Sequence, residues 1–245
     1  MKRRVAAEPA VLFELIDGGR IAIVTLNRPQ RLNAYDVAMR DALYETLLAV
    51  RDDPEVGAVV LRGNGPAFST GGDVREFGTA PSPTRAREVR WARDVWGTLR
   101  SLPHPTIAAV HGWVVGGGWE MAMLCDLCIG SADARFALPE TGLAMIPGVA
   151  GTQTLPRAIG VGRAMDCVLT GRWLDAREAQ ALGLLVRIVP RARLDAVALR
   201  QATRLASAGA PVVRACKRAV QQGLDLPLRS GLALERRLSE MRAQP

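Results

Sequence analysis

The residue types best suited to chemistry lie within Ile107–Met121, where an apolar run is followed by the triplet Gly116–Gly118 and then by Glu120. Glycine has no Cβ, so a triplet lets the backbone bend sharply or come close to a ligand. A helix that begins directly after the triplet points unpaired N–H groups at that ligand. The spacing predicts backbone donors for a developing oxyanion, with a carboxylate on the first helical turn. The alternative is a strand–turn–helix corner in which the small residues serve packing alone.

Two other segments combine small residues with carboxylates. The loop Arg62–Asp73 contains the stretch Ala67–Asp73, which reads A-F-S-T-G-G-D. A second carboxylate, Glu140, follows Pro139 after a short apolar segment. A carboxylate acts as a general acid or a general base when its surroundings tune its pKa. Together with the glycine triplet, these segments are the three candidate pieces of a site.

The elements that must position these residues alternate between strands and helices. Apolar runs and alternation predict strands at 11–16, 21–26, 56–61, 107–110, 127–131, 135–138 and 184–189. Helical spacing predicts a helix capped by Asn33 that ends at Pro54, a helix after Gly148, and helices at 85–102, 175–182, 194–207, 211–222 and 227–241. Residues 80–83 are expected to form a flexible excursion. Strand–helix units without an internal repeat predict an α/β core at 1–189 and a helical region at 190–245.

Length and composition fit a globular protein with one large core, since the chain has 245 residues of which 49% are hydrophobic. The sequence contains neither the ~20 apolar residues of a membrane span nor the apolar region of a signal peptide, so we expect a cytoplasmic location. The net charge is +8, and its 32 basic residues include only two lysines. Residues 85–102, rich in arginine and carrying Trp91 and Trp96, could bind nucleic acid, but a solvated amphipathic helix is the favoured interpretation.

The four cysteines indicate neither a disulfide framework nor a metal site. Cys125 and Cys128 form a C-x-x-C pair inside apolar sequence, without a second cysteine pair or a nearby histidine for zinc. We expect two buried thiols that pack as small hydrophobic side chains, and no metal ion.

Five blocks of sequence, in the same order, resemble the crotonase superfamily of enoyl-CoA hydratases and isomerases. They are T-L-N-R-P-Q-R-L-N-A at Thr25–Ala34, A-F-S-T-G-G-D-V-R-E at Ala67–Glu76, P-T-I-A-A-V-H-G-W-V-V-G-G-G-W-E at Pro105–Glu120, P-G-V-A-G-T-Q-T-L-P-R at Pro147–Arg157 and T-G-R-W-L-D-A-R-E-A at Thr170–Ala179. The resemblance spans about residues 11–223. It implies a ββα spiral of two roughly perpendicular sheets, followed by C-terminal helices that mediate trimers, often paired into hexamers.

The resemblance also assigns the chemistry to four residues. It implies that the backbone amides of Thr70 and Gly117 stabilise an enolate-like oxygen of a CoA thioester, where each donor is commonly worth about 10²–10³-fold in rate. Glu120 and Glu140 match the two carboxylates that hold one water in hydratases of this family. We expect Glu120 to activate that water and Glu140 to deliver the proton to C2. Two carboxylates that face one substrate should have their pKa values pushed apart.

The resemblance places the CoA part of the substrate against a basic and polar set: Arg28, Arg31, Ser69, Asp73, Gly116 and Lys217. Because CoA arrives as part of the substrate, no separate cofactor is expected. The family commonly continues into a final segment that covers the acyl pocket. The sequence here ends E-R-R-L-S-E-M-R-A-Q-P, so we expect a shortened C-terminal region and an altered lid over the pocket.

The leading hypothesis is therefore an enoyl-CoA hydratase-like lyase. Retention of both glutamates favours hydration, because isomerases of this superfamily commonly lose the first position. Isomerisation, hydration of a cyclic dienoyl thioester and ring-opening hydrolysis are the alternatives on the same scaffold. The alternative from a different class is a non-catalytic, basic RNA-binding protein, whose affinity would fall steeply with salt.

Overall fold

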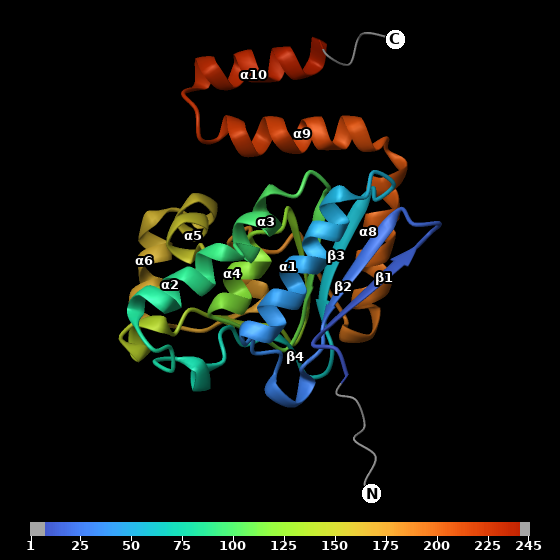
Figure 1. The fold of residues 1–245 in the computed structure, drawn as a ribbon. Coiled ribbons are helices and arrows are strands. Elements are labelled where there is room, and N and C mark those ends of the chain that lie inside the picture. Colours follow the sequence, from blue (N-terminus) through green and yellow to red (C-terminus); the bar gives the residue numbers. More distant parts are fainter. Residues whose placement is uncertain (1–7, 241–245) are drawn as a thin grey trace, which may run out of the picture.

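A computed structural model describes residues 8–240, in which helices surround two β-sheets (Figure 1). The larger sheet has the strand order β1-β2-β3-β5-β7-β10, and the smaller sheet has the order β4-β6-β8-β9. β1 and β9 are antiparallel to their neighbours, whereas the other pairs are parallel. The predicted α/β fold with two sheets is thus confirmed.

The strands are β1 Val11–Ile16, β2 Ile21–Leu26, β3 Ala58–Gly63, β4 Ala67–Ser69, β5 Thr106–Val110, β6 Trp113–Val115, β7 Leu127–Ser131, β8 Arg135–Ala137, β9 Leu174–Asp175 and β10 Arg187–Val189. The helices are α1 Val37–Asp52, α2 Pro83–Ala92, α3 Val95–Ser101, α4 Gly117–Met123, α5 Gly151–Ile159, α6 Val161–Thr170, α7 Ala176–Ala181, α8 Leu194–Ser207, α9 Ala210–Gly223 and α10 Leu228–Glu240.

Three times in succession the chain passes from the larger sheet to the smaller one: from β3 to β4, from β5 to β6 and from β7 to β8. Since β4, β6 and β8 are parallel neighbours, their carboxyl ends lie at one edge of the smaller sheet. Gly112 permits the second crossing. Its φ is +52°, and a Cβ there would lie 2.0 Å from the carbonyl oxygen of Pro66, so only glycine fits.

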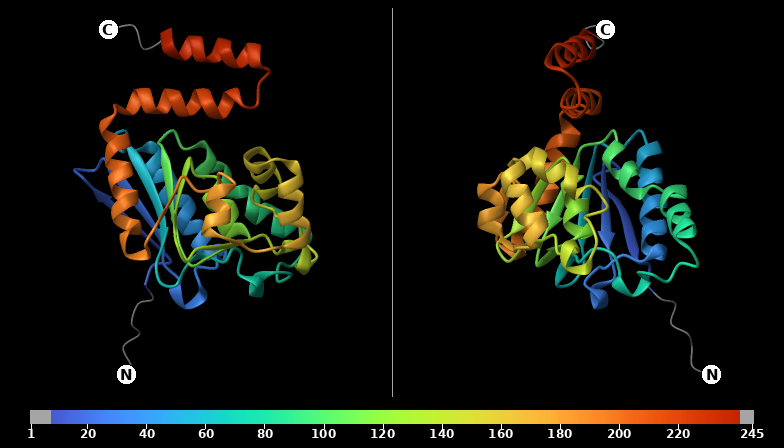
Figure 2. Two further views of the ribbon diagram at one scale, coloured as in Figure 1. Left: turned by 180° about the vertical axis from the view of Figure 1, so that it is seen from behind. Right: turned by 90° about the vertical axis from the view of Figure 1, so that its left-hand side faces the viewer.

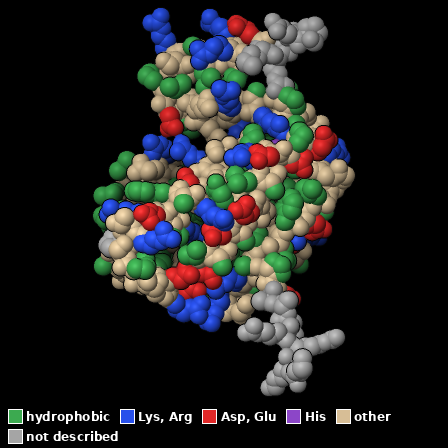
Figure 3. Space-filling model, in the orientation of Figure 1, with side chains coloured by type: hydrophobic (Ala, Val, Ile, Leu, Met, Phe, Trp, Pro, Cys, Tyr) green, Lys and Arg blue, Asp and Glu red, His purple; other side chains and the backbone are tan. Residues whose placement is uncertain are grey.

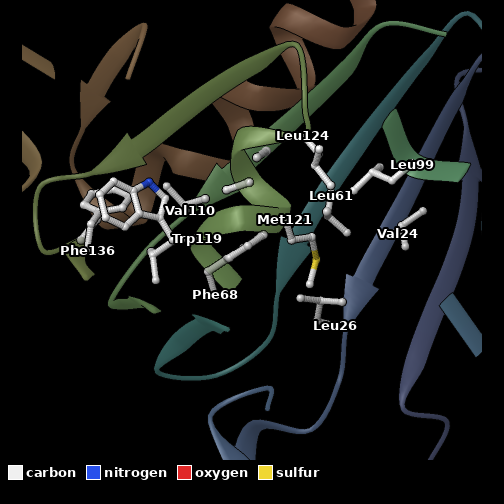
Figure 4. Close-up of a cluster of buried hydrophobic side chains, with 14 of the residues drawn as sticks. Val24, Leu26, Leu61, Phe68, Leu99, Val110, Trp119, Met121, Leu124 and Phe136 are labelled. Atoms are coloured by element: carbon white, nitrogen blue, oxygen red, sulfur yellow. The ribbon is translucent and has the colours of Figure 1, made fainter. Parts of the chain in front are cut away.

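Helix α4 is fixed by apolar packing between the sheets (Figure 4). Its Trp119 packs against Phe136 of β8, with ring centroids 5.6 Å apart. Its Met121 is fully buried in the same cluster as Leu61 and Phe68. Close packing of several large side chains leaves this short helix little freedom. Any polar group on α4 is therefore held in a defined direction.

The helix α1 begins later than the sequence pattern predicts. Asp36, not Asn33, is its N-cap, and the Asp36 carboxylate accepts a 2.8 Å hydrogen bond from the N–H of Met39. Asn33 instead adopts a left-handed conformation with φ +55°. Its side-chain amide donates to the carbonyl oxygens of Asn64 and Ala67, at 2.9 and 2.8 Å, and so fixes the start of β4.

The single helix predicted at 85–102 is two helices, α2 and α3. The break occurs because the Asp94 side chain accepts a hydrogen bond from the N–H of Gly97 and starts a new helix there. The sequence reading also missed β6 and α6 and made the last strand too long, since β10 begins only at Arg187.

Charges of both signs are interspersed on the face seen in Figure 3, rather than forming a basic patch. Arg93 pairs with Asp41 and Glu45 of α1, and Arg85 pairs with Glu88 within α2. These ion pairs favour the solvated-helix interpretation of residues 85–102 over a nucleic-acid surface.

The helices after residue 190 differ in how they pack. α8 lies on the larger sheet and buries Leu194, Val197, Ala198 and Ala202 there. α9 and α10 form a hairpin that extends away from the body (Figures 1 and 2). α9 buries no residue fully and α10 buries only Leu234. The domain division at residue 190 stays a prediction. By its contacts, α8 packs with the larger sheet rather than with α9 and α10. Among residues 8–240, no helix has the length and apolar character needed to cross a membrane.

Candidate active site

The three crossings end at the three sequence segments singled out for chemistry. β4 leads to Thr70, β6 leads to Gly116, and β8 leads through Pro139 to Glu140. The ends are in contact, because the Gly116 N–H donates a 2.9 Å hydrogen bond to the carbonyl oxygen of Ala137. A Cβ at Gly116 would lie only 2.7 Å from Oε1 of Glu140. The structure thus brings the glycine triplet and the second carboxylate together.

Glu120 lies on α4 and is 1% exposed. Its Oε1 accepts three backbone hydrogen bonds, from the N–H groups of Val149, Ala150 and Gly151, at 3.0, 2.8 and 2.6 Å. Gly151 is the first residue of α5, so one carboxylate oxygen joins the starts of two helices. These donors occupy Oε1 and fix the direction of the other oxygen, Oε2.

Glu140 begins a 3₁₀-helix at Glu140–Leu143 and is 7% exposed. Burial raises the pKa of its carboxyl to about 7, and the negative charge of Glu120 adds to the increase. Its Oε2 is buried and has no hydrogen-bond partner within the described residues. Burying a carboxyl oxygen without a hydrogen bond costs free energy of folding, so Oε2 of Glu140 is suited to bind a substrate or a water.

We expect Glu140→Gln to stabilise the fold at pH 8 but not at pH 4. The carboxyl pKa is about 7 in the folded protein against an ordinary value of 4.5. Folding therefore disfavours the ionised form, and this penalty is absent below pH 4.5, grows up to pH 7 and is complete above it. The shift corresponds to about 3 kcal/mol at pH 8. Urea unfolding of both proteins at the two pH values measures it, and an equal difference between them at pH 4 and pH 8 would contradict it.

In the loop after β4, the backbone N–H groups are already hydrogen-bonded within the fold, whereas the predicted oxyanion site requires a free N–H at Thr70. The Thr70 N–H donates a 3.1 Å hydrogen bond to the carbonyl oxygen of Leu32, and the Gly71 N–H donates a 3.2 Å bond to Oγ of Ser69. The Gly117 N–H, by contrast, has no acceptor within residues 8–240. A Cβ at Gly71 would lie 2.9 Å from the Gly117 nitrogen, so the two loops touch. Of the two predicted donors, only Gly117 is open in this structure.

Two of the residues predicted to bind CoA belong to one ion network. Arg28 pairs with Asp36 at 2.9 Å and with Asp73 at 3.5 Å, and its side chain is largely buried. Arg75 and Arg28 together hold the pKa of Asp73 well below its usual range. Arg31 is exposed at the end of a short 3₁₀-helix that follows Arg28.

The remaining two predicted CoA residues make contacts within the fold. Ser69 is fully buried, and its hydroxyl donates to the carbonyl oxygen of Asn33 at 2.9 Å. Lys217 on α9 pairs with Asp126 at 2.7 Å and donates to the carbonyl oxygen of His104, also at 2.7 Å. Its ammonium group therefore lies in a cluster apart from the two glutamates. The CoA-binding roles stay predictions.

One residue of the site, Tyr35, was not anticipated from the sequence. Its hydroxyl lies against Gly117, since a Cβ at that glycine would be 2.1 Å from Oη. The signal that could have found it is its position directly after Asn33 and Ala34, at the end of the first family-like block. The predicted helix from Asn33 includes Tyr35, and an aromatic side chain at the start of a helix is typical of a core residue.

The C-x-x-C pair behaves as a packing feature. Cys125 and Cys128 are free and partly buried, and they pack against the main apolar cluster. Burial raises the pKa of both thiols, which disfavours the nucleophilic thiolate. We assign no chemistry to them.

Comparison with known proteins gives one consistent picture. The family model described as enoyl-CoA hydratase/isomerase matches residues 17–244. A protein of Rhizobium meliloti, named as a probable enoyl-CoA hydratase, is 42% identical over 90% of this chain and 85% of its own length.

Solved structures agree with the sequence match. The enoyl-CoA hydratase of Mycobacterium smegmatis superimposes with a TM-score of 0.90 at 30% identity, over 97% of this chain and 92% of the other. An enoyl-CoA hydratase candidate from Thermobifida fusca, solved in complex with CoA, has a TM-score of 0.88 at 32% identity, over 96% of this chain and 93% of the other.

Proposed function

Because the chain belongs to the enoyl-CoA hydratase/isomerase family, we propose that it hydrates the C2=C3 double bond of an enoyl-CoA thioester. One observation carries the proposal: two buried carboxylates, Glu120 and Glu140, lie on the segments that follow the neighbouring strands β6 and β8, together with the open amide of Gly117. Proton transfer to and from carbon needs two such groups, and the charge that develops on the thioester oxygen needs the donor.

The reaction follows from the state of each group. Glu120, held through Oε1 by three amides, uses its other oxygen to take a proton from water as the water oxygen bonds to C3. The electrons of the double bond move to the thioester oxygen, where the Gly117 N–H stabilises the enolate-like state. Glu140, protonated below about pH 7, then gives its proton to C2 as the carbonyl reforms. Proton exchange with solvent returns both carboxyls to their starting states.

Thr70 is the second proposed donor to the thioester oxygen. Its N–H donates to the carbonyl oxygen of Leu32 in this structure. In the complex it would share that hydrogen bond with the substrate or exchange it. Its hydroxyl also donates to the Leu32 carbonyl oxygen, at 3.4 Å.

Two buried carboxylates support hydration over movement of the double bond, because an isomerase needs only one group that carries a proton between C2 and C4. The CoA portion would lie toward Arg28, Arg31 and Asp73, and CoA enters as part of the substrate. A trimeric or hexameric assembly and a cytoplasmic location remain expectations of the family resemblance.

The test is a panel of enoyl-CoA thioesters of increasing acyl length, including cyclic dienoyl thioesters. Loss of the absorbance of the conjugated thioester, with a 3-hydroxyacyl product identified by mass, is the expected result. A β,γ-unsaturated product of unchanged mass, or hydrolysis of a ring, would replace hydration with a sister reaction. Absence of any turnover across the panel would overturn the proposal.

The pH profile tests the assignment of the acid. If Glu140 must be protonated in the free enzyme, kcat/KM falls as pH rises through about 7, the value to which burial brings its pKa. In Glu140→Gln this descending limb should disappear together with most of the rate. A wild-type profile that stays flat between pH 6 and 9 would contradict the assignment.

A further inference from the structure

Tyr35 is held rigidly at the edge of the proposed acyl site. Its N–H donates to the carbonyl oxygen of Gly71 at 2.8 Å, and its own carbonyl oxygen accepts from the N–H of Asp73 at 2.9 Å. Its ring packs against Trp96, with centroids 5.0 Å apart. The backbone and the ring are thus both held, which fixes the position of the hydroxyl oxygen.

The hydroxyl oxygen lies against Gly117. A Cβ at Gly117 would overlap the Tyr35 hydroxyl at 2.1 Å, so the phenol occupies the space that any larger residue there would need. Within the described residues the hydroxyl makes no hydrogen bond. It is a donor without an acceptor, placed beside the open amide of Gly117.

The surroundings keep this hydroxyl protonated. Burial raises the pKa of Tyr35 above its ordinary value, and the charges of Glu120 and Glu140 raise it further, while Arg90 and Arg40 oppose them. Toward a nearby oxygen that becomes negative, a neutral phenol acts as a hydrogen-bond donor.

The Thr70 N–H donates to the carbonyl oxygen of Leu32 in this structure, so that amide alone is a divided donor to the thioester oxygen. We propose that the Tyr35 hydroxyl donates a hydrogen bond to the thioester oxygen next to the Gly117 N–H, as a side-chain member of the oxyanion site. The inference rests on the proposed function only in taking a CoA thioester as the ligand. Tyr35 keeps its proton throughout and is neither the acid nor the base.

Tyr35→Phe tests the inference, because it removes the hydroxyl and keeps the ring that packs on Trp96. Tyr44→Phe is the matched control, since Tyr44 is the chain's other tyrosine and lies on α1 against the core. Removing one oxyanion donor should lower kcat on an enoyl-CoA by about 10²-fold with little change in KM. Tyr44→Phe should leave both values unchanged.

A binding measurement separates this inference from the proposed function. Acetoacetyl-CoA is a thioester that can bind as its enolate, and the bound enolate is followed by its ultraviolet absorbance. Tyr35→Phe should reduce the fraction bound as enolate at a given pH, whether or not the wild-type protein hydrates any enoyl-CoA. If the wild type fails to hydrate but this difference persists, only the proposed function falls. If Tyr35→Phe matches wild type in enolate binding, or changes KM alone, then Tyr35 is only a wall of the pocket and the inference is wrong.

Discussion

Glu120→Gln should lower the rate of hydration by about 10²–10⁴-fold, the usual contribution of a positioned general base. The substitution is unusually clean here. A glutamine Oε1 can still accept the three N–H groups of Val149, Ala150 and Gly151, so the join between α4 and α5 is kept. What disappears is the basicity of the group that activates water. The rate is measured as kcat on the best thioester of the panel.

A control is available on the surface. Glu45 on α1 is exposed and pairs with Arg93, so Glu45→Gln should retain the wild-type kcat. Circular dichroism and the unfolding midpoint check that Glu120→Gln is folded. A folded Glu120→Gln protein with wild-type kcat would rule out Glu120 as the base.

Gly112→Ala should destabilise the fold by about 2–5 kcal/mol, through backbone strain and overpacking together. The φ of Gly112 is +52°, and the added methyl group would lie 2.0 Å from the carbonyl oxygen of Pro66. Neither partner can move easily, because Pro66 precedes β4 and Gly112 joins β5 to β6. The expected result is a large drop in the urea midpoint, or an insoluble protein.

Gly162→Ala provides the opposite case. A Cβ at Gly162 would meet no atom within 4 Å, and the residue lies near the start of α6. Alanine there should leave stability unchanged or raise it by up to about 1 kcal/mol. Equal midpoints for the two alanine variants would show that the crossing at Gly112 is looser than the structure indicates.

The sequence was sufficient for the parts of the site that depend on local chemistry. The glycine triplet and Glu120 are adjacent in the chain, so their relation follows from strand–turn–helix geometry alone. The predicted strands at 11–16, 21–26 and 127–131 are confirmed to the residue, because short apolar or alternating runs bounded by turn residues mark them. Glu140 could be assigned to the same site only through the family resemblance. It lies 20 positions after Glu120, and its proximity to the glycine triplet depends on the pairing of β6 with β8.

What could not be predicted depends on competition between nearby groups. Asn33 and Asp36 both suit a helix cap, and tertiary hydrogen bonds to Asn64 and Ala67 take Asn33 away from that role. β6 is only three residues long and includes an exposed tryptophan, which gives no periodic signal. The direction of the Tyr35 hydroxyl depends on packing against Trp96, a residue 61 positions later in the chain. Such contacts exist only once the fold is complete.

The hairpin of α9 and α10 has a consequence for amide hydrogen exchange. Slow exchange requires burial and contacts that resist local opening, and this hairpin buries only Leu234 and contacts the body through a few polar side chains such as Lys217. In an isolated chain its amides should therefore exchange far sooner than those of β5, which is buried along its whole length. Strong protection along α10, which lies farther from the body, would indicate another molecule that covers it, so deuterium uptake there tests for assembly.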